Sequence, residues 1–202
     1  MDRIAILGGS FNPPCNHHLR IGYAVSDFFD RVLVIPCGPR PWTEKQSVNK
    51  ILPIHRGNMA RLAFEKIPKV QVELFDLERS VFTRTHLLEE MYKSSGEIWH
   101  VVGADLVQGG QTGQSKIQAV WYLGQEMWYN LNFVVIERAG YPICKDDLPP
   151  HCKVFEISNG KKCSSSYVRE LRAAGKPFEN FVPNKIAEYI KIHNLYQEGG
   201  KE

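Results

Sequence analysis

The sequence of 202 residues has few cysteines, no Cys-x-x-Cys pair and no long apolar run. Its five cysteines are odd in number and widely spaced, which favours reduced thiols over a disulfide framework or structural zinc. A mixed metal site at Cys15, His17 and His18 is disfavoured because three ligands crowded into adjacent positions seldom face one ion. The first residues lack the apolar core of a signal peptide, and no stretch reaches about 18 apolar residues. We therefore expect a cytoplasmic protein that does not enter a membrane.

Net charge is also small, because 25 Lys and Arg face 22 Asp and Glu, for a formal charge of +3. This balance gives no sign of nucleic-acid binding, so any anionic ligand must be held by locally placed charge. Two common phosphate-binding patterns are missing: Gly-x-Gly-x-x-Gly, and a Walker loop ending in Gly-Lys-Ser or Gly-Lys-Thr. A Rossmann dinucleotide fingerprint and a P-loop are therefore excluded.

Short apolar runs and segments with helical spacing alternate along the chain, which predicts an α/β protein with a Rossmann-like, doubly wound parallel sheet and helices on both faces. We expect a single domain over residues 1–202 with a small C-terminal helical segment. The predicted strands are 4–7, 32–35, 70–74, 98–102, 133–136 and 154–157. The predicted helices are 19–29, 53–66, 83–93, 117–130, 165–174 and 183–193. Residues 106–116 are polar and glycine-rich, which predicts a flexible loop.

The segment after the first predicted strand, Gly-Gly-Ser-Phe-Asn-Pro-Pro-Cys-Asn-His-His at residues 8–18, leads into the first predicted helix. Ligands of such sheets bind beyond the carboxyl ends of the strands. Gly8 and Gly9 allow close backbone approach, and the helix N-terminus favours an anion, so a phosphate fits here. The alternative is a plain strand-to-helix turn.

A serine cluster at residues 164–166 opens a predicted helix, with Arg169 one turn inside it. Serine hydroxyls, helix N–H groups and an arginine fork suit phosphate oxygens, although serine is also an ordinary helix cap. We interpret residues 160–196 as a second phosphate-binding and helical segment. Two such segments in one small domain indicate a polyphosphate ligand.

Together these motifs resemble the nicotinate or nicotinamide mononucleotide adenylyltransferases of the nucleotidyltransferase superfamily. The likeness rests on the first-loop motif and on Ser-Ser-Ser-x-x-Arg, supported by further segments in the same order along the chain. Those segments are His55-Arg56 with Met59, Phe82-Thr83-Arg84-Thr85, Gly103-Ala104-Asp105, Trp121 and Glu137-Arg138-Ala139-Gly140. One departure stands out, because the superfamily has His-x-Gly-His where this chain has Cys15, Asn16, His17 and His18. Either His17 supplies the missing imidazole, or the site is slower or altered.

The resemblance implies in-line attack of a mononucleotide phosphate on the α-phosphorus of ATP, with release of pyrophosphate and Mg²⁺ carried in with ATP. It implies catalytic roles for His18 and Arg169. The implied ATP-binding residues are Gly8, Gly9, Ser10, Phe11, Cys15, His17, Gly103, Asp105, Ser165 and Ser166. For Asp105 the alternative is a helix cap.

The same resemblance implies a mononucleotide site built from aromatic walls, hydroxyls and basic residues. Its implied members are Trp42, Lys45, Arg56, Phe82, Thr83, Thr85, Trp121 and Arg138. A core position remains the alternative for the two tryptophans, and a helix cap for the two threonines. Arg40 competes with Lys45 for the mononucleotide phosphate, and solvated surface charge is the alternative for both.

Two other functions stay open. The first is another nucleotidyltransferase, such as a pantetheine-phosphate adenylyltransferase. The second is a catalytically impaired nucleotide-binding protein, which the altered first loop makes plausible. The sequence leaves the preference for the nicotinate or the nicotinamide substrate undecided, and likewise the oligomeric state.

Overall fold

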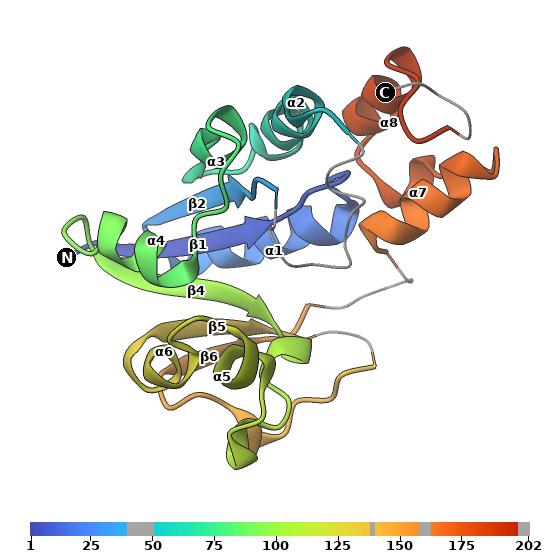
Figure 1. The fold of residues 1–202 in the computed structure, drawn as a ribbon. Helices are drawn as coiled ribbons and strands as arrows, with labels where there is room; N and C mark the ends of the chain where they lie inside the picture. The colour runs from blue at the N-terminus through green and yellow to red at the C-terminus, as the bar shows by residue number, and fades with distance from the viewer. Residues whose placement is uncertain (40–50, 138–139, 158–162, 198–202) are drawn as a thin grey trace.

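A six-stranded parallel sheet lies at the centre of the computed structural model, which describes residues 1–39, 51–137, 140–157 and 163–197 (Figure 1). Its strand order is β3-β2-β1-β4-β5-β6, and the order reverses between β1 and β4. This confirms the predicted Rossmann-like sheet, and in such sheets ligands bind beyond the ends of the two strands where the order reverses. The strands are β1 (Arg3–Gly9), β2 (Arg31–Pro36), β3 (Val70–Val72), β4 (Glu97–Gly103), β5 (Asn132–Ile136) and β6 (Cys152–Phe155).

Helices cover both faces of the sheet, as predicted. Successive residues of β1 point to opposite faces: Ala5 and Leu7 join one apolar cluster, whereas Ile4 and Ile6 join another. The first cluster contains side chains of α1, α2, α7 and α8, and the second contains Leu88 of α4. A third cluster packs α5 and α6 on β4 and β5. The longer helices are α1 (Asn16–Phe28), α2 (Pro53–Phe64), α4 (Thr85–Tyr92), α5 (Lys116–Val120), α6 (Gly124–Asn130), α7 (Ser165–Ala173) and α8 (Asn184–Ile192).

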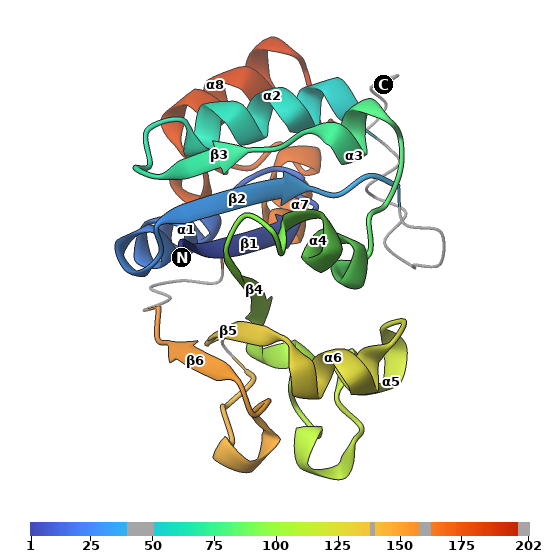
Figure 2. The same ribbon diagram turned by 90° about the vertical axis from the view of Figure 1, so that its left-hand side faces the viewer.

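The C-terminal helices pack against the first half of the chain. Figure 2 shows α8 beside α2, and the first apolar cluster runs from Ala5 to Leu195. The ranges of α7 and α8 agree with the predicted helices to within one residue at each end. Because this cluster joins the N-terminal and C-terminal parts of the chain, it supports the proposal of a single domain.

The helix predicted over 117–130 is wrong in its centre, where the chain breaks into α5 and α6. Leu123 adopts a left-handed backbone with φ 59°. A Cβ on Gly124 would collide with the carbonyl oxygen of Ile117, so glycine is what allows the two short helices to pack this closely. The apolar spacing continues through this break, and the pattern therefore misses it.

The predicted helix over 83–93 begins later, at Thr85. Thr83 instead lies in a loop, where its backbone N–H and hydroxyl both donate to the buried carboxylate of Asp76, the hydroxyl at 2.6 Å. Asp76 belongs to a short helix that the sequence did not predict, α3 (Phe75–Glu78), and β3 correspondingly ends at Val72 rather than at residue 74.

Residues 106–116, which the sequence predicted to be a flexible loop, contain regular turns. They include parts of two 3₁₀ turns, η2 (Ala104–Leu106) and η3 (Gly110–Thr112), and Ser115, which caps α5. Val107 and Gly110 are buried, and a Cβ on Gly110 would lie 2.6 Å from the ring of Trp128. The mobility of this segment stays a prediction.

Two further 3₁₀ turns are η4 (Lys145–Asp147) and η5 (Glu179–Phe181). Among the helices of the described residues, none is long and apolar enough to cross a membrane.

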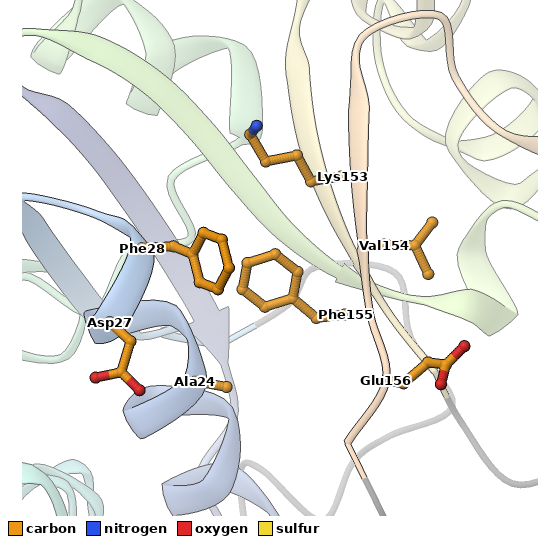
Figure 3. A pocket seen from close by; sticks show the side chains of 7 residues that line it. All are labelled: Ala24, Asp27, Phe28, Lys153, Val154, Phe155 and Glu156. Carbon is orange, nitrogen blue, oxygen red and sulfur yellow. The ribbon is translucent and has the colours of Figure 1, made fainter.

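A pocket lies between α1 and β6, where the rings of Phe28 and Phe155 are 4.8 Å apart (Figure 3). None of the predicted site residues lines this pocket.

His55 makes the contact between α2 and α8 sensitive to pH. Its Nδ1 lies 3.0 Å from the hydroxyl of Tyr189, and its ring centre lies 5.0 Å from that of His193. Burial, and then the charge of His193, lower the pKa of His55 below its usual value. The folded state therefore binds this proton less well than the unfolded chain does.

We expect the stabilising effect of neutral His55 to be complete above about pH 6.5 and to be lost as pH falls through the lowered pKa. Urea midpoints at pH 7.5 and pH 5 should differ more in the wild type than in His55→Gln. His151→Gln is the matched control, because His151 is exposed and should leave the wild-type difference unchanged. Equal pH dependence in wild type and His55→Gln would contradict the assignment.

Candidate active site

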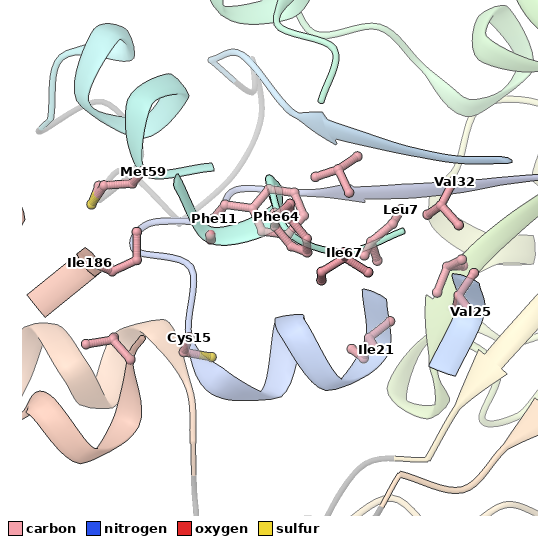
Figure 4. Packing of buried hydrophobic residues seen from close by; sticks show 14 of the residues in the cluster. Leu7, Phe11, Cys15, Ile21, Val25, Val32, Met59, Phe64, Ile67 and Ile186 are labelled. Carbon is pink, nitrogen blue, oxygen red and sulfur yellow. The ribbon is translucent and has the colours of Figure 1, made fainter. Parts of the chain in front are cut away.

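The first loop leaves β1 at the point where the strand order reverses, and it is anchored by the ring of Phe11. That ring is 1% exposed and meets the rings of His18 and Phe64 edge to face, with centres 5.2 and 5.4 Å away. Figure 4 shows Phe11 above α1, packed with Phe64 and close to Met59. Packing of Phe11 in the core therefore fixes the position of the first loop.

His18 is held at the N-terminus of α1 by the backbone of Cys15. The Cys15 N–H donates to Nδ1 of His18 at 3.0 Å, and the Cys15 sulfur lies 3.2 Å from the same nitrogen. A ring nitrogen that accepts the backbone N–H carries no proton itself, so the imidazole proton is on Nε2. The capping contact thus fixes both the position and the tautomer of His18.

The start of α7 docks directly onto this loop. Arg169 donates to the carbonyl oxygen of Asn12 at 2.6 Å, and the hydroxyl of Ser165 donates to that of Pro13 at 2.8 Å. Arg169 also donates to the hydroxyl of Ser166 at 3.1 Å. The structure therefore brings together the two predicted phosphate-binding segments, which lie about 150 residues apart in sequence.

Three predicted ligand contacts have side chains that are removed from solvent: Phe11, Cys15 and Arg56 are 1%, 0% and 1% exposed. Arg56 donates to the carbonyl oxygens of Ser10 (3.1 Å) and Cys37 (2.7 Å). Burial lowers the pKa of its guanidinium. In this structure these side chains support the loop from inside, and their predicted contacts with a ligand stay predictions.

The predicted nucleoside residues lie at the carboxyl edge of the sheet. Gly103 ends β4, and Asp105 follows in η2, with Lys116 3.8 Å from its carboxylate. Thr85 begins α4, and Trp121 ends α5 half-buried against the third cluster. Arg84 lies 5.1 Å from the ring of Tyr122, next to Trp121, so the start of α4 and the end of α5 meet.

The remaining predicted residues differ in their contacts and in their exposure to solvent. Thr83 is engaged with Asp76, and Phe82 beside it is half-buried. Gly8 is exposed, while Gly9, Ser10 and His17 are half-buried. Outside the described residues lie Arg40, Trp42, Lys45 and Arg138.

Two residues that sequence reasoning missed complete the loop. The hydroxyl of Tyr196 donates to the side-chain oxygen of Asn12 at 2.6 Å, so the end of the chain holds the first loop. Asn12 was visible within the motif, but nothing local to Tyr196 indicated its partner. In the part of the chain that the structure describes, no three His, Cys, Asp or Glu side chains are grouped to hold a metal ion.

Comparison with known proteins matches this arrangement to one family. The sequence model of the cytidylyltransferase-like family covers residues 6–171, which include the first loop and Arg169. The chain belongs to the cytidylyltransferase-like family.

Relatives of this cytidylyltransferase-like chain match over nearly their whole length. It is 27% identical to the nicotinate-nucleotide adenylyltransferase of Bacillus subtilis, with 98% of this chain and 100% of that protein covered. It is 31% identical to a protein of Corynebacterium kroppenstedtii named "probable nicotinate-nucleotide adenylyltransferase", over 98% and 93% of the two chains. The fold is similar to that of the Plasmodium falciparum nicotinic acid mononucleotide adenylyltransferase complexed with NaAD. That match has a TM-score of 0.76 and 23% identity, and it covers 97% of this chain and 98% of the other.

Proposed function

We propose that this protein is an adenylyltransferase that joins ATP to nicotinate or nicotinamide mononucleotide, forming the NAD-type dinucleotide and pyrophosphate in NAD biosynthesis. The observation that carries the proposal is the docking of Arg169 onto Asn12 of the loop that holds His18. One imidazole N–H donor and one guanidinium thereby belong to a single rigid unit beside the end of β1. The names of the relatives favour this family member over a pantetheine-phosphate adenylyltransferase.

The attacking group is already a phosphate anion near neutral pH, so catalysis rests on positioning and on stabilising the charge of the transition state. We assign the stabilisation of that charge to His18 and Arg169, with Nε2–H of His18 as a hydrogen-bond donor to the ATP phosphates. Backbone groups of Gly8 and Gly9 and the hydroxyls of Ser10 and Ser166 complete the cradle. Mg²⁺ arrives bound to ATP through phosphate oxygens.

We assign the crevice beyond β4 to the nucleosides. Gly103 and Asp105 are placed for the ATP ribose, whose hydroxyls a carboxylate accepts well. Thr85, Phe82 and Trp121 border the neighbouring space, which suits a flat pyridine ring. Lys45, Trp42 and Arg138 stay assigned to the mononucleotide from the family resemblance alone. We also assign the protein to the cytoplasm, where cysteines that form no disulfide, as in this structure, are the usual case.

The test incubates the full chain with ATP, Mg²⁺ and one acceptor at a time, and measures both pyrophosphate and the dinucleotide by mass. We expect both products with a pyridine mononucleotide, and the faster rate with the nicotinate form, because both curated relatives carry that name. Phosphopantetheine serves as the matched third acceptor and should give neither product.

Two results would contradict the proposal. ATP binding without pyrophosphate release from any acceptor would identify a nucleotide-binding protein that lacks the reaction. Faster product formation with phosphopantetheine would assign the chain to the other branch of the family.

A further inference from the structure

Two cysteines face each other across the junction between the first loop and α7. Cys15 is in the loop, and Cys163 lies just before α7. The Cys15 thiol donates to the carbonyl oxygen of Cys163 at 3.9 Å, which places the two cysteines side by side. The bonds from Ser165 to Pro13 and from Arg169 to Asn12 fix the two segments in this arrangement.

The two sulfur atoms differ in exposure. Cys15 is 0% exposed, whereas Cys163 is half-buried and so reachable from solvent. One member of the pair can therefore meet a small oxidant, and the other is positioned directly behind it.

They also differ in pKa. Besides Cys15, the backbone N–H groups of His17 and Asn16, in the first turn of α1, stabilise the thiolate form of Cys163, as helix N-termini do for other thiolates. The carbonyl oxygen of Phe181, 3.2 Å from that sulfur, favours the thiol form. The Cys15 thiol and the helix N–H groups outweigh it and lower the pKa of Cys163 to about 6. The pKa of Cys15 is raised by donating to Cys163 and by burial.

We propose that Cys15 and Cys163 form a reversible oxidation site that responds to hydrogen peroxide by closing a disulfide between the first loop and α7. The Cys163 thiolate attacks one peroxide oxygen, the O–O bond breaks, and a sulfenic acid and hydroxide form. Cys15 then attacks the oxidised sulfur, the S–S bond forms, and the S–O bond breaks with loss of water. Two electrons have passed from the thiols to the peroxide, and a dithiol restores both thiols by exchange.

The disulfide has a consequence for the site, and this part rests on the proposed function. Cys15 holds Nδ1 of His18 through its backbone N–H, with its sulfur 3.2 Å from the same nitrogen. Drawing that sulfur onto Cys163 moves the group that orients His18. Since small displacements at a reacting centre can cost about 100-fold in rate, we expect oxidised protein to be at least about tenfold slower.

The experiment treats the reduced full chain with hydrogen peroxide, blocks remaining thiols, and maps the peptides by mass spectrometry without reductant. We expect a linked peptide joining Cys15 to Cys163 that disappears with dithiothreitol. Cys163→Ala should give no linked peptide, and its rate, relative to its own untreated value, should resist peroxide. Cys144→Ser is the matched control: Cys144 is exposed, and its replacement should leave both the link and the inhibition in place.

The inference is overturned if peroxide leaves Cys15 and Cys163 unlinked in folded protein, or links either one chiefly to another cysteine. A linked protein with an unchanged rate would overturn the effect on the site. If no form of the chain transfers adenylyl groups, the proposed function fails, and the linked peptide still decides the oxidation site independently.

Discussion

Replacing His18 with alanine is expected to slow pyrophosphate release by about 100- to 1,000-fold, the usual effect of removing one fixed donor to transition-state charge. The dissociation constant for the mononucleotide should change little, because the proposed contact is with the ATP phosphates. The chain should also stay folded, since the His18 side chain is half-buried and its backbone remains in α1. Steady-state rates, with mononucleotide binding measured by calorimetry, separate these effects.

His17→Ala is the matched variant for this experiment, and it decides how the unusual loop works. Successive residues of a helix point about 100° apart, so the two neighbouring imidazoles face different directions. We expect His17→Ala to cost much less than His18→Ala. An equal or larger loss would show that His17 supplies the imidazole that the superfamily places at the position of Cys15. Full activity of His18→Ala would remove His18 from the mechanism.

Replacing Arg56 with alanine is expected to destabilise the protein by about 3 kcal/mol or more. The change leaves the half-buried carbonyl oxygen of Ser10 and the buried one of Cys37 without this donor and opens a cavity in the core, and each lost partner costs about 1–3 kcal/mol. Urea unfolding measures the loss. Because Ser10 and Cys37 follow β1 and β2, the carboxyl edge of the sheet should loosen as well, and adenylyl transfer should fall further than stability alone explains.

Arg61→Ala provides the control for charge and helix composition, because Arg61 is on the same helix but exposed. Its effect should stay within about 0.5 kcal/mol. Arg56→Lys should recover part of the loss, since a lysine reaches one carbonyl but lacks the arginine fork. A stability of Arg56→Ala equal to that of Arg61→Ala would contradict the supporting role.

The sheet was predictable because each of its strands is indicated by the residues of that strand alone. Each buried strand reads as a short apolar run, and helical spacing between the runs requires parallel crossovers. What failed depends on contacts made elsewhere. Gly124 allows the break between α5 and α6 because a side chain at this position would collide with the backbone of Ile117. Gly110 likewise leaves room for the ring of Trp128. Neither constraint is visible in the residues around the glycine.

In the candidate site, too, local motifs were predictable from the sequence, whereas contacts between distant residues were not. The first loop and the serine cluster were recognisable as motifs, and the structure brings them together. Arg56 was predicted as a ligand contact because a cation near a helix start is unfavourable on a surface, and the structure adds its burial and its two carbonyl partners, which the sequence did not indicate. Thr83 resembled a substrate contact until Asp76 appeared beside it in space.

The hydrogen bonds from Ser165, Arg169 and Tyr196 to the first loop also determine when the loop becomes ordered during synthesis. All six strands are synthesised before any of these residues, since β6 ends at Phe155. A nascent chain folds from its N-terminus, so its sheet assembles while the loop still lacks the partners that fix it. Nucleotide affinity should therefore arise only after these three residues join the loop, and a chain stopped before Ser165 would neither sequester nor consume ATP.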